Sequence, residues 1–501
     1  MDTRLDTLEA KGLIQVAAYR PELEYLFRHW LVQDAAYGSL LKQERRQLHR
    51  LVGETLESLY PERRHEMAGI LAMHFEQAGD SGKAIGYLIA DGRYALDRAA
   101  LNEAFMAFDR AMRLLPDEAD DESDDLRRRR VEIAILRAQA GMTFRPTDEQ
   151  VADLESVVPS AERLADLELV AQIHLHLALA RIEGGQAASD PAVRRSLDRL
   201  TEIGTALDDP SLAALPLAMM AMGKIFTGPL REGVEALERA IPLMEKRRDF
   251  IGAAFSRGWL AIGYASLGEF DRAEEAARAA AQEAASGDLI ARLDAQIAEA
   301  MVRSARGELD EAAPLAMSCV QQAEDTGAIA CAVASAWVLG DVRQRQQRFT
   351  DAREALQLGL DLAPGSDAAM WGPTLRAWLY ANADRLSDPE PGTADWDEML
   401  RIARGRQSGM GEAAILWKRA EAASSRRRWE MADADYGASA ALYEKQGARP
   451  TLARVLRGWG ETLRLAGRGA DGDEKLRQGL TLFEEMGLAR ESAEVRASLT
   501  S

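Results

Sequence analysis

Cysteine is nearly absent from this chain, which has two cysteines in 501 residues, Cys319 and Cys331. Two thiols cannot build a disulfide framework, and their scarcity indicates a reducing compartment. The first residues, MDTRLDTLEAKG, are charged and lack the apolar core of a signal peptide. The longest apolar runs, residues 212–223 and 328–340, are too short to span a bilayer. We therefore expect a cytoplasmic protein with no membrane partner.

Basic side chains are outnumbered, because 62 Lys and Arg stand against 81 Asp and Glu, for a formal net charge of -19. An acidic surface repels a phosphate backbone, so nucleic acid is not an expected partner. Two local arginine runs, residues 127–130 and 426–428, depart from this pattern. Because such runs usually lie on solvated faces of helices, we interpret both in that way.

Motifs for catalysis and for cofactor binding are missing as well. The sequence contains no G-x-x-x-x-G-K-[ST] phosphate loop, and no segment reads convincingly as a strand. Of the six histidines, His174 and His176 are two positions apart on a predicted helix and so point to different faces. No Ser-His-Asp or Cys-His set is evident. We expect no catalytic residue, no cofactor and no metal site, and hence a protein that is not an enzyme.

The most prominent feature that is present is a repeated turn of the pattern small-x-apolar-x-x-small, clearest at Gly268–Ala273. Glycine tolerates the left-handed conformation at a helix end, and the closing small residue lets the second helix approach the first. The pattern predicts helix-turn-helix units with a period of about 40 residues. The closing small residues stand at positions 104, 233, 273, 312, 352, 432 and 472, with spacings after 233 of 40, 39, 40, 80 and 40.

The spacing inside the units favours tetratricopeptide hairpins over HEAT or armadillo units. Ala104, Phe108, Ala111 and Pro116 follow the A-x3-F-x2-A pattern with a terminating proline. We predict an all-α fold, an α-solenoid of about ten helix-turn-helix repeats with a small N-terminal helical cap. The predicted regions are a cap at 1–60 with a helix starting near Pro21, repeats at 61–386 that are degenerate at 118–215, and repeats at 387–501 after a Pro-rich connector.

A block near the N-terminus carries a resemblance to a known family. Its segments are 24–29 (EYLFRH), 33–37 (QDAAY), 45–49 (RRQLH) and 74–80 (HFEQAGD). Together with the repeats, they resemble the bacterial STAND-type signal-transduction ATPases, in which a nucleotide-switch ATPase and a winged helix precede a tetratricopeptide array. The resemblance implies that residues 1–60 are the end of the winged helix and its junction with the repeats. Trp30 departs from the family pattern, which usually has a small residue there.

The same resemblance implies a regulatory role in a larger protein. The repeats would sense an effector or partner and bias an upstream ATPase, with a class III adenylate or guanylate cyclase as an N-terminal effector. LuxR-like transcription activators, which carry a helix-turn-helix after the repeats, fit second, because this chain stops soon after its last predicted helix pair. His29 and His49 belong to the family block, and we expect them to pack and to form hydrogen bonds.

Tryptophans follow the repeat and are the candidates for function. Trp259, Trp337, Trp378, Trp417 and Trp459 are spaced by 78, 41, 39 and 42 residues, which places each in the middle of a first helix. Because first helices line the concave groove of a tetratricopeptide array, these rings could form a binding strip. The alternative is that each ring packs within its own hairpin. Polar candidates on the same helical faces are Asp341, Gln344, Arg345, Lys418, Glu421, Arg454, Arg457 and Glu461.

A solenoid offers a long curved surface, which suits binding better than catalysis. The leading hypothesis is a non-catalytic regulatory or scaffold module of a signal-transduction ATPase. The alternatives are a free-standing adaptor that binds peptides and the sensor region of a transcription activator. The expected partner is a protein or peptide in the concave groove, the upstream ATPase domain of the same protein, or a small effector.

Overall fold

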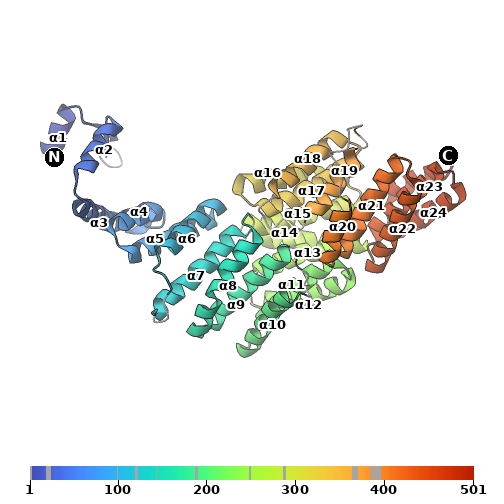
Figure 1. Cartoon of the computed structure of the whole chain (residues 1–501), viewed down its shortest axis with the longest axis horizontal. Coiled ribbons are helices and arrows are strands. Elements are labelled where there is room, and N and C mark those ends of the chain that lie inside the picture. Colours follow the sequence, from blue (N-terminus) through green and yellow to red (C-terminus); the bar gives the residue numbers. More distant parts are fainter. Residues whose placement is uncertain are drawn as a thin grey trace. The chain divides into compact units, whose positions relative to one another are not determined.

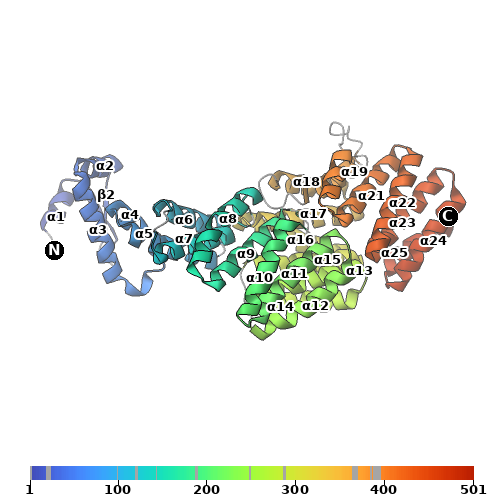
Figure 2. The ribbon, with the colours of Figure 1, turned by 60° about the horizontal axis from the view of Figure 1, so that its bottom comes forward.

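The computed structural model of the chain describes residues 3–18, 24–98, 100–118, 122–142, 144–184, 186, 190–247, 250–285, 289–363, 371–383, 386 and 396–500. These residues form 25 α-helices, one short 3-10 helix and one two-stranded sheet. The predicted all-α class is therefore confirmed. Helices follow one another as antiparallel hairpins along the chain, as Figures 1 and 2 show. The polypeptide divides into two compact units, which are described separately below.

The first unit comprises Met1–Tyr94 and Met106–Glu118. It begins with a helix, a β-hairpin and a second helix, and continues as helical hairpins. Helices α5 and α6 are shared with the second unit. The elements are α1 (Thr3–Ala10), β1 (Ile14–Ala18), β2 (Glu24–Phe27), α2 (Trp30–Ser39), α3 (Lys42–Leu59), η1 (Pro61–Arg63), α4 (Ala68–Ala78), α5 (Ser81–Asp97) and α6 (Leu101–Leu114).

The β-hairpin corrects the prediction that the chain has no strand. Strands β1 and β2 pair antiparallel, with Ile14 opposite Phe27 and Val16 opposite Tyr25. Pairs of β-branched and aromatic residues suit a pleated surface, but runs of five and four residues are too short to show a strand period. The helix expected to start near Pro21 is also wrong, because Glu24–Phe27 is a strand and α2 begins at Trp30. Pro21 itself lies outside the described residues.

The core of the first unit centres on Phe75 of α4, which is fully buried. Its ring stacks on Tyr87 at 5.6 Å and packs with Leu71 and Ala84. A Cβ on Gly53 of α3 would lie 2.9 Å from the Phe75 ring, so glycine at this position allows α3 to pack closely on α4. Phe75 and the small apolar group around it therefore hold α3, α4 and α5 together.

Three residues of the family block are joined by hydrogen bonds across α2, α3 and α4. The Tyr37 hydroxyl lies 2.9 Å from His49 Nε2, and His49 Nδ1 lies 3.0 Å from His74 Nδ1. The hydrogen-bonding role predicted for His49 is thus confirmed. Burial lowers the pKa of both histidines, and the charge of His49 lowers that of His74 further.

We expect the first unit to lose stability in mild acid. The pKa values of His49 and His74 lie lower in the folded protein than the value of 6.5 for an unperturbed histidine. The unfolded chain then binds more protons, so stabilisation is complete above pH 6.5 and declines as the pH falls below it. Denaturant midpoints of this unit at pH 7.5 and 5 measure the effect. The variant His74→Gln should show a smaller decline, and an equal decline in both proteins would contradict this assignment.

The second unit comprises Ala95–Phe105 and Ala119–Ser501 and holds the regular repeats. Its helices are α7 (Asp124–Gly141), α8 (Thr147–Leu164), α9 (Leu167–Glu183), α10 (Pro191–Ala206), α11 (Pro210–Thr227), α12 (Leu230–Arg247), α13 (Phe250–Leu267), α14 (Phe270–Ala284), α15 (Leu289–Arg306), α16 (Leu309–Thr326), α17 (Ile329–Arg345), α18 (Phe349–Leu362), α19 (Gly372–Ala383), α20 (Trp396–Gly405), α21 (Gly409–Ser425), α22 (Trp429–Gln446), α23 (Arg449–Leu465), α24 (Gly469–Glu485) and α25 (Ala489–Thr500). In both Figure 1 and Figure 2, helices α22, α23 and α24 lie side by side.

Five of the predicted turns have a left-handed residue at the end of the first helix, whereas Gly228 at the predicted turn between α11 and α12 does not have a positive φ. Gly268, Gly307 and Gly467 have φ values of +83°, +86° and +82°, as expected for the residue that ends the first helix. Two copies use other residues at this position, Gln347 with φ of +62° and Arg427 with φ of +57°. Ala99, where one turn copy begins, and residues 387–395 of the Pro-rich connector lie outside the described residues.

The closing small residues serve the close approach that was predicted for them. Ala273 and Ala432 are fully buried. At Gly472 of α24 a Cβ would lie 2.7 Å from the carbonyl oxygen of Gly460 on α23, and the reverse distance is also 2.7 Å. Likewise, a Cβ on Gly233 would lie 2.9 Å from the carbonyl oxygen of Ala221. These backbone-to-backbone contacts leave no room for a side chain.

The odd-numbered helices from α11 to α23 are the first helices of seven successive hairpins, and each contacts the next odd-numbered helix. The two ends of this series of helices also meet, because α11 contacts α21 and α13 contacts α23. Phe270 at the start of α14 packs with Phe483 and Leu488 near the end of the chain. The Ser408 hydroxyl donates to the carbonyl oxygen of Phe226 at 3.4 Å. The repeats of this unit therefore wind through a closed turn.

The interpretation of residues 127–130 as a solvated face is wrong for Arg127 and Arg130. Arg127 is 7% exposed and pairs with Asp124, and the Arg130 guanidinium donates to Glu122 at 2.8 Å. These two positions share the helical face of Val131, which is buried. The carboxylates that balance them, Asp124 and Glu122, stand just before the run in the sequence, but the structure is needed to show the pairing and the burial. Among the described residues, no helix combines the length and apolar character needed to cross a membrane.

Candidate functional site

Three of the predicted tryptophans meet in the second unit and form a continuous row. Trp337 of α17, Trp378 of α19 and Trp417 of α21 lie near the middle of their helices, as the 40-residue spacing predicts. The ring centroids of Trp337 and Trp378 are 5.7 Å apart, and those of Trp378 and Trp417 are 5.9 Å apart, both edge to face. We call these three residues the tryptophan row. Its rings pack between repeats rather than only within their own hairpins.

Further aromatic rings extend the row across the closed turn of repeats. Trp371 lies 5.2 Å from Trp337 and 5.7 Å from Phe226, and Phe226 lies 4.7 Å from Trp259. Trp259 is therefore connected to the tryptophan row through Phe226 and Trp371. Sequence reasoning missed Trp371 and Phe226, although Trp371 stands directly before α19, seven residues before Trp378.

Trp459 has its own polar partners and makes no ring contact with the tryptophan row among the described residues. Its Nε1 donates to Asp433 at 2.6 Å, and the Lys475 ammonium lies 4.2 Å from its ring centroid. Both partners come from the helices on either side, α22 and α24. This ring therefore contacts its own hairpin and the preceding one, and it stands apart from the tryptophan row.

A buried cation lies against the row. Lys418 is 4% exposed, and its ammonium is 4.5 Å from the Trp378 centroid and 4.3 Å from the Trp417 centroid. The same ammonium lies 3.0 Å from a Glu421 carboxylate oxygen and 3.5 Å from the Gln344 side-chain oxygen. A buried ammonium needs such partners, because its transfer from water is costly. Four predicted residues, Lys418, Glu421, Trp378 and Trp417, are thus in one site.

Two more predicted residues hold Trp378 in place. Its Nε1 donates to Asp341 at 3.0 Å, and the Gln344 side-chain amide donates to its carbonyl oxygen at 2.9 Å. Burial first, and then the carboxylates Asp341 and Glu421, raise the pKa of the buried Tyr443 hydroxyl. Sequence reasoning did not find Tyr443, which comes from a second helix, α22. The centre of the row is therefore fully supported by polar partners.

The two outer rings of the row are not supported in this way. The indole Nε1 atoms of Trp337 and Trp417 are buried, and neither has a hydrogen-bond acceptor among the described residues. A buried donor left without an acceptor costs about 1–3 kcal/mol. The row thus holds two buried N–H donors without acceptors among the described residues, and the Lys418 ammonium lies against one of the two rings, Trp417.

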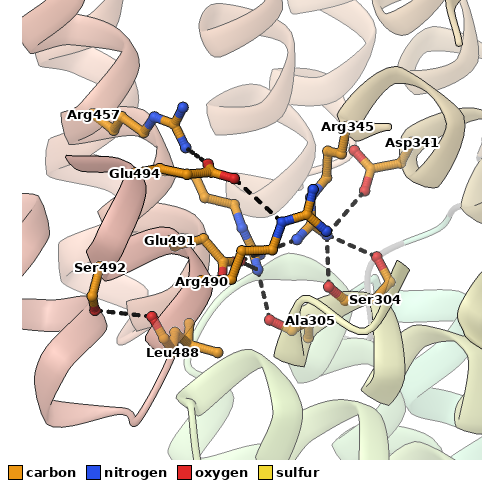
Figure 3. A network of polar contacts seen from close by, with 11 residues as sticks. Ser304, Ala305, Asp341, Arg345, Arg457, Leu488, Arg490, Glu491, Ser492 and Glu494 are labelled. Carbon is orange, nitrogen blue, oxygen red and sulfur yellow. Dashed lines mark hydrogen bonds and ion pairs between the residues drawn. The ribbon is translucent and has the colours of Figure 1, made fainter. Parts of the chain in front are cut away.

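The remaining predicted residues make other polar contacts, and Figure 3 shows the contacts around Arg345 and Glu491. Arg345 and Arg454 both donate to one oxygen of Glu491, at 3.3 and 3.2 Å. Arg457 donates to Glu461 at 2.9 Å. Arg345 links this cluster to the row, because it lies 3.8 Å from Asp341. Burial, with the nearby charge of Arg454, lowers the pKa of Arg345 to about 10, so it remains a cation at neutral pH.

Comparison by sequence finds little. No family model matches the chain. An uncharacterized protein of Rhizobium meliloti (strain 1021) is 30% identical over 109 residues, which are 22% of this chain and 11% of that protein. The match therefore spans about a tenth of the length of this relative.

Comparison by structure identifies the fold. A Rap protein, solved in complex with competence and sporulation factor, has a TM-score of 0.54 and 13% sequence identity, and the match covers 72% of this chain and 99% of that one. A STAND protein with a tetratricopeptide repeat sensor from Pyrococcus horikoshii has a TM-score of 0.42 and 15% identity, over 83% of this chain and 59% of that one. The chain therefore has a helical-repeat solenoid fold of the tetratricopeptide and Rap type.

Proposed function

We propose that this chain is a non-catalytic regulatory module that binds a protein or peptide partner at the tryptophan row. The observation that carries the proposal is the pair of buried, unpaired indole N–H groups of Trp337 and Trp417, which stand on either side of Trp378 with Lys418 against the rings. Tryptophan supplies large contact area at low entropic cost, and clusters of it often dominate binding energy.

The chemical groups of the tryptophan row favour one kind of partner segment. It offers apolar ring surface, two N–H donors and an ammonium, so it fits a segment with an apolar side chain flanked by carbonyl or carboxylate oxygens. An extended peptide carries such oxygens along its backbone. The Rap protein with the same fold was solved with competence and sporulation factor bound, which supports a binding role for this array as well.

The larger setting that we propose is a bacterial, cytoplasmic signal-transduction ATPase of the STAND type. Support comes from the family block, whose residues Tyr37, His49 and His74 are joined by hydrogen bonds. A helix followed by the β1–β2 hairpin is also consistent with the end of a winged helix at residues 1–60. Both cysteines are buried and neither forms a disulfide, as suits a reducing compartment. In this setting the repeats would regulate an upstream ATPase and an effector such as a nucleotide cyclase.

A free-standing adaptor is the second candidate, favoured by the match that covers 99% of the Rap protein. The DNA sequence upstream of the segment that encodes this chain separates the two. An in-frame phosphate-binding loop there supports the ATPase setting, and a stop codon close upstream supports the adaptor.

We expect the variants Trp337→Ala and Trp417→Ala to lose the partner. The whole chain is immobilised, and proteins retained from the native lysate are quantified by mass spectrometry. Loss of two central aromatic contacts should reduce specific capture by at least about tenfold. The control is Trp459→Ala, which removes the same side chain from outside the row and should retain capture.

A more conservative pair of variants tests the two indole N–H donors alone. Trp337→Phe and Trp417→Phe keep an aromatic ring but remove the N–H groups, so the fold should be retained and capture should fall by severalfold. Unchanged capture by all four variants, with helical circular dichroism intact, would contradict the proposed binding site.

A further inference from the structure

One carboxylate of the last helix ties together repeats that are far apart in the sequence. Glu491 of α25 accepts from Arg345 of α17 at 3.3 Å and from Arg454 of α23 at 3.2 Å. Arg345 and Glu491 are 146 residues apart, and Glu491 is 7% exposed. Figure 3 shows Glu491 facing Arg345 across the boundary between these repeats. We call Glu491, Arg345 and Arg454 the latch.

The same two arginines also bind the end of a third helix. Arg345 donates to the Ser304 carbonyl oxygen at 2.6 Å, and Arg454 donates to the Ala305 carbonyl oxygen at 2.6 Å. These carbonyls belong to the last turn of α15, where carbonyl groups lack partners within the helix and the helix dipole favours cations. The latch therefore joins the middle repeats of the second unit to its final hairpin.

The latch is connected to the tryptophan row by direct contacts. Arg345 lies 3.8 Å from Asp341, and Asp341 accepts from the Trp378 indole at 3.0 Å. A movement of Arg345 would therefore remove a countercharge from the carboxylate that positions the centre of the row. A chain of direct contacts that has two arrangements can carry coupling between two sites.

Some buried polar atoms of the latch and of the tryptophan row have no hydrogen-bond partner among the described residues. The second carboxylate oxygen of Glu491 and the Nε atom of Arg454 are buried and have no hydrogen-bond partner among the described residues. Burial of the unpaired indole N–H groups of Trp337 and Trp417 costs further free energy. Unsatisfied buried groups raise the free energy of a closed state relative to an open one. The closed turn thus holds polar groups that opening would release to solvent or to a partner.

We propose that the latch is an autoinhibitory contact, which keeps the repeats closed over the tryptophan row until partner binding or a change at α25 opens it. This inference rests on the function proposed above for the row. In the closed state Trp378 is 3% exposed and Trp417 is 9% exposed, so an external partner has little access to either ring. Opening the contact between α25 and α17 would expose them.

The experiment measures solvent access to each ring without any partner. The whole chain is labelled with 5-fluorotryptophan, and fluorine NMR records the relaxation caused by a soluble gadolinium chelate. Trp30, which is 69% exposed, is the internal reference. In Glu491→Ala the effect on Trp378 and Trp417 should rise at least about threefold over the wild type. Glu491→Gln, which keeps the shape and removes the charge, should shift both signals in the same direction.

The matched control is Glu494→Ala, one turn further along α25. Glu494 pairs with Arg457 at 2.6 Å and Arg490 at 3.2 Å, both within the final hairpin and its capping helix, and its side chain is 41% exposed. It should match the wild type. The proposal is overturned if both Glu491 variants match this control, or if they lose helical circular dichroism instead of exposing the row. Since no partner is used, this outcome is independent of the capture experiment.

Discussion

Replacing Phe75 by alanine is expected to destabilise the first unit by about 3–5 kcal/mol, the usual cost of removing a buried phenylalanine side chain. Phe75 is fully buried, stacks on Tyr87, and fills the space that Gly53 leaves between α3 and α4. A domain of this size has a total stability of about 5–15 kcal/mol, so the loss is a large part of it. We expect α3 to α5 to open while the regular repeats stay folded.

Hydrogen exchange followed by mass spectrometry measures this result segment by segment. In Phe75→Ala, peptides from α4 and α5 should exchange much faster, and peptides from α21 to α24 should be unchanged. The control is Leu59→Ala, whose side chain is 63% exposed and whose loss should cost under about 0.5 kcal/mol. Equal loss of protection in both units would show that they unfold together and would contradict the expectation that the regular repeats stay folded.

Replacing Gly460 by alanine is expected to cost about 2–3 kcal/mol, because the new methyl group meets backbone that cannot move aside. A Cβ at this position would lie 2.7 Å from the Gly472 carbonyl oxygen and 2.7 Å from Leu476 Cγ. Helices α23 and α24 would have to separate, and the contacts of α23 with α13 would weaken with them.

Thermal and denaturant unfolding of the regular repeats measures the effect of Gly460→Ala. The control is Gly469→Ala at the start of α24, where nothing lies within 4 Å of an added Cβ. Alanine there should be neutral or slightly stabilising, since it restricts the unfolded chain. A neutral Gly460→Ala would show that the two helices are not held at the distance described.

Much of the fold could be predicted from the sequence because each hairpin repeats the same local requirements. Gly268 ends a helix in the left-handed conformation, and Ala273 and Gly472 permit close packing of the next helix. These requirements depend on neighbours within one repeat, so a single copy shows them. The β1–β2 hairpin escaped prediction because its strands are too short for a period to be visible.

The candidate site was predicted in part for the same reason. The 40-residue period located Trp337, Trp378 and Trp417 on successive first helices, where they do meet. It could not locate Phe226 or Glu491, which reach the site or the latch only because the turn of repeats closes. Such contacts between residues separated by well over a hundred positions leave no periodic signal in a single sequence.

The tryptophan row is the proposed binding site of the partner, and Lys418→Met tests this proposal most directly. The variant removes a buried ammonium that lies against both Trp378 and Trp417, and it leaves the rings in place. Lys475→Met is the control, because Lys475 lies in the same way over Trp459, outside the row. We predict that partner capture by Lys418→Met falls by at least about tenfold, while capture by Lys475→Met equals that of the wild type. Equal capture by all three folded proteins would contradict the account.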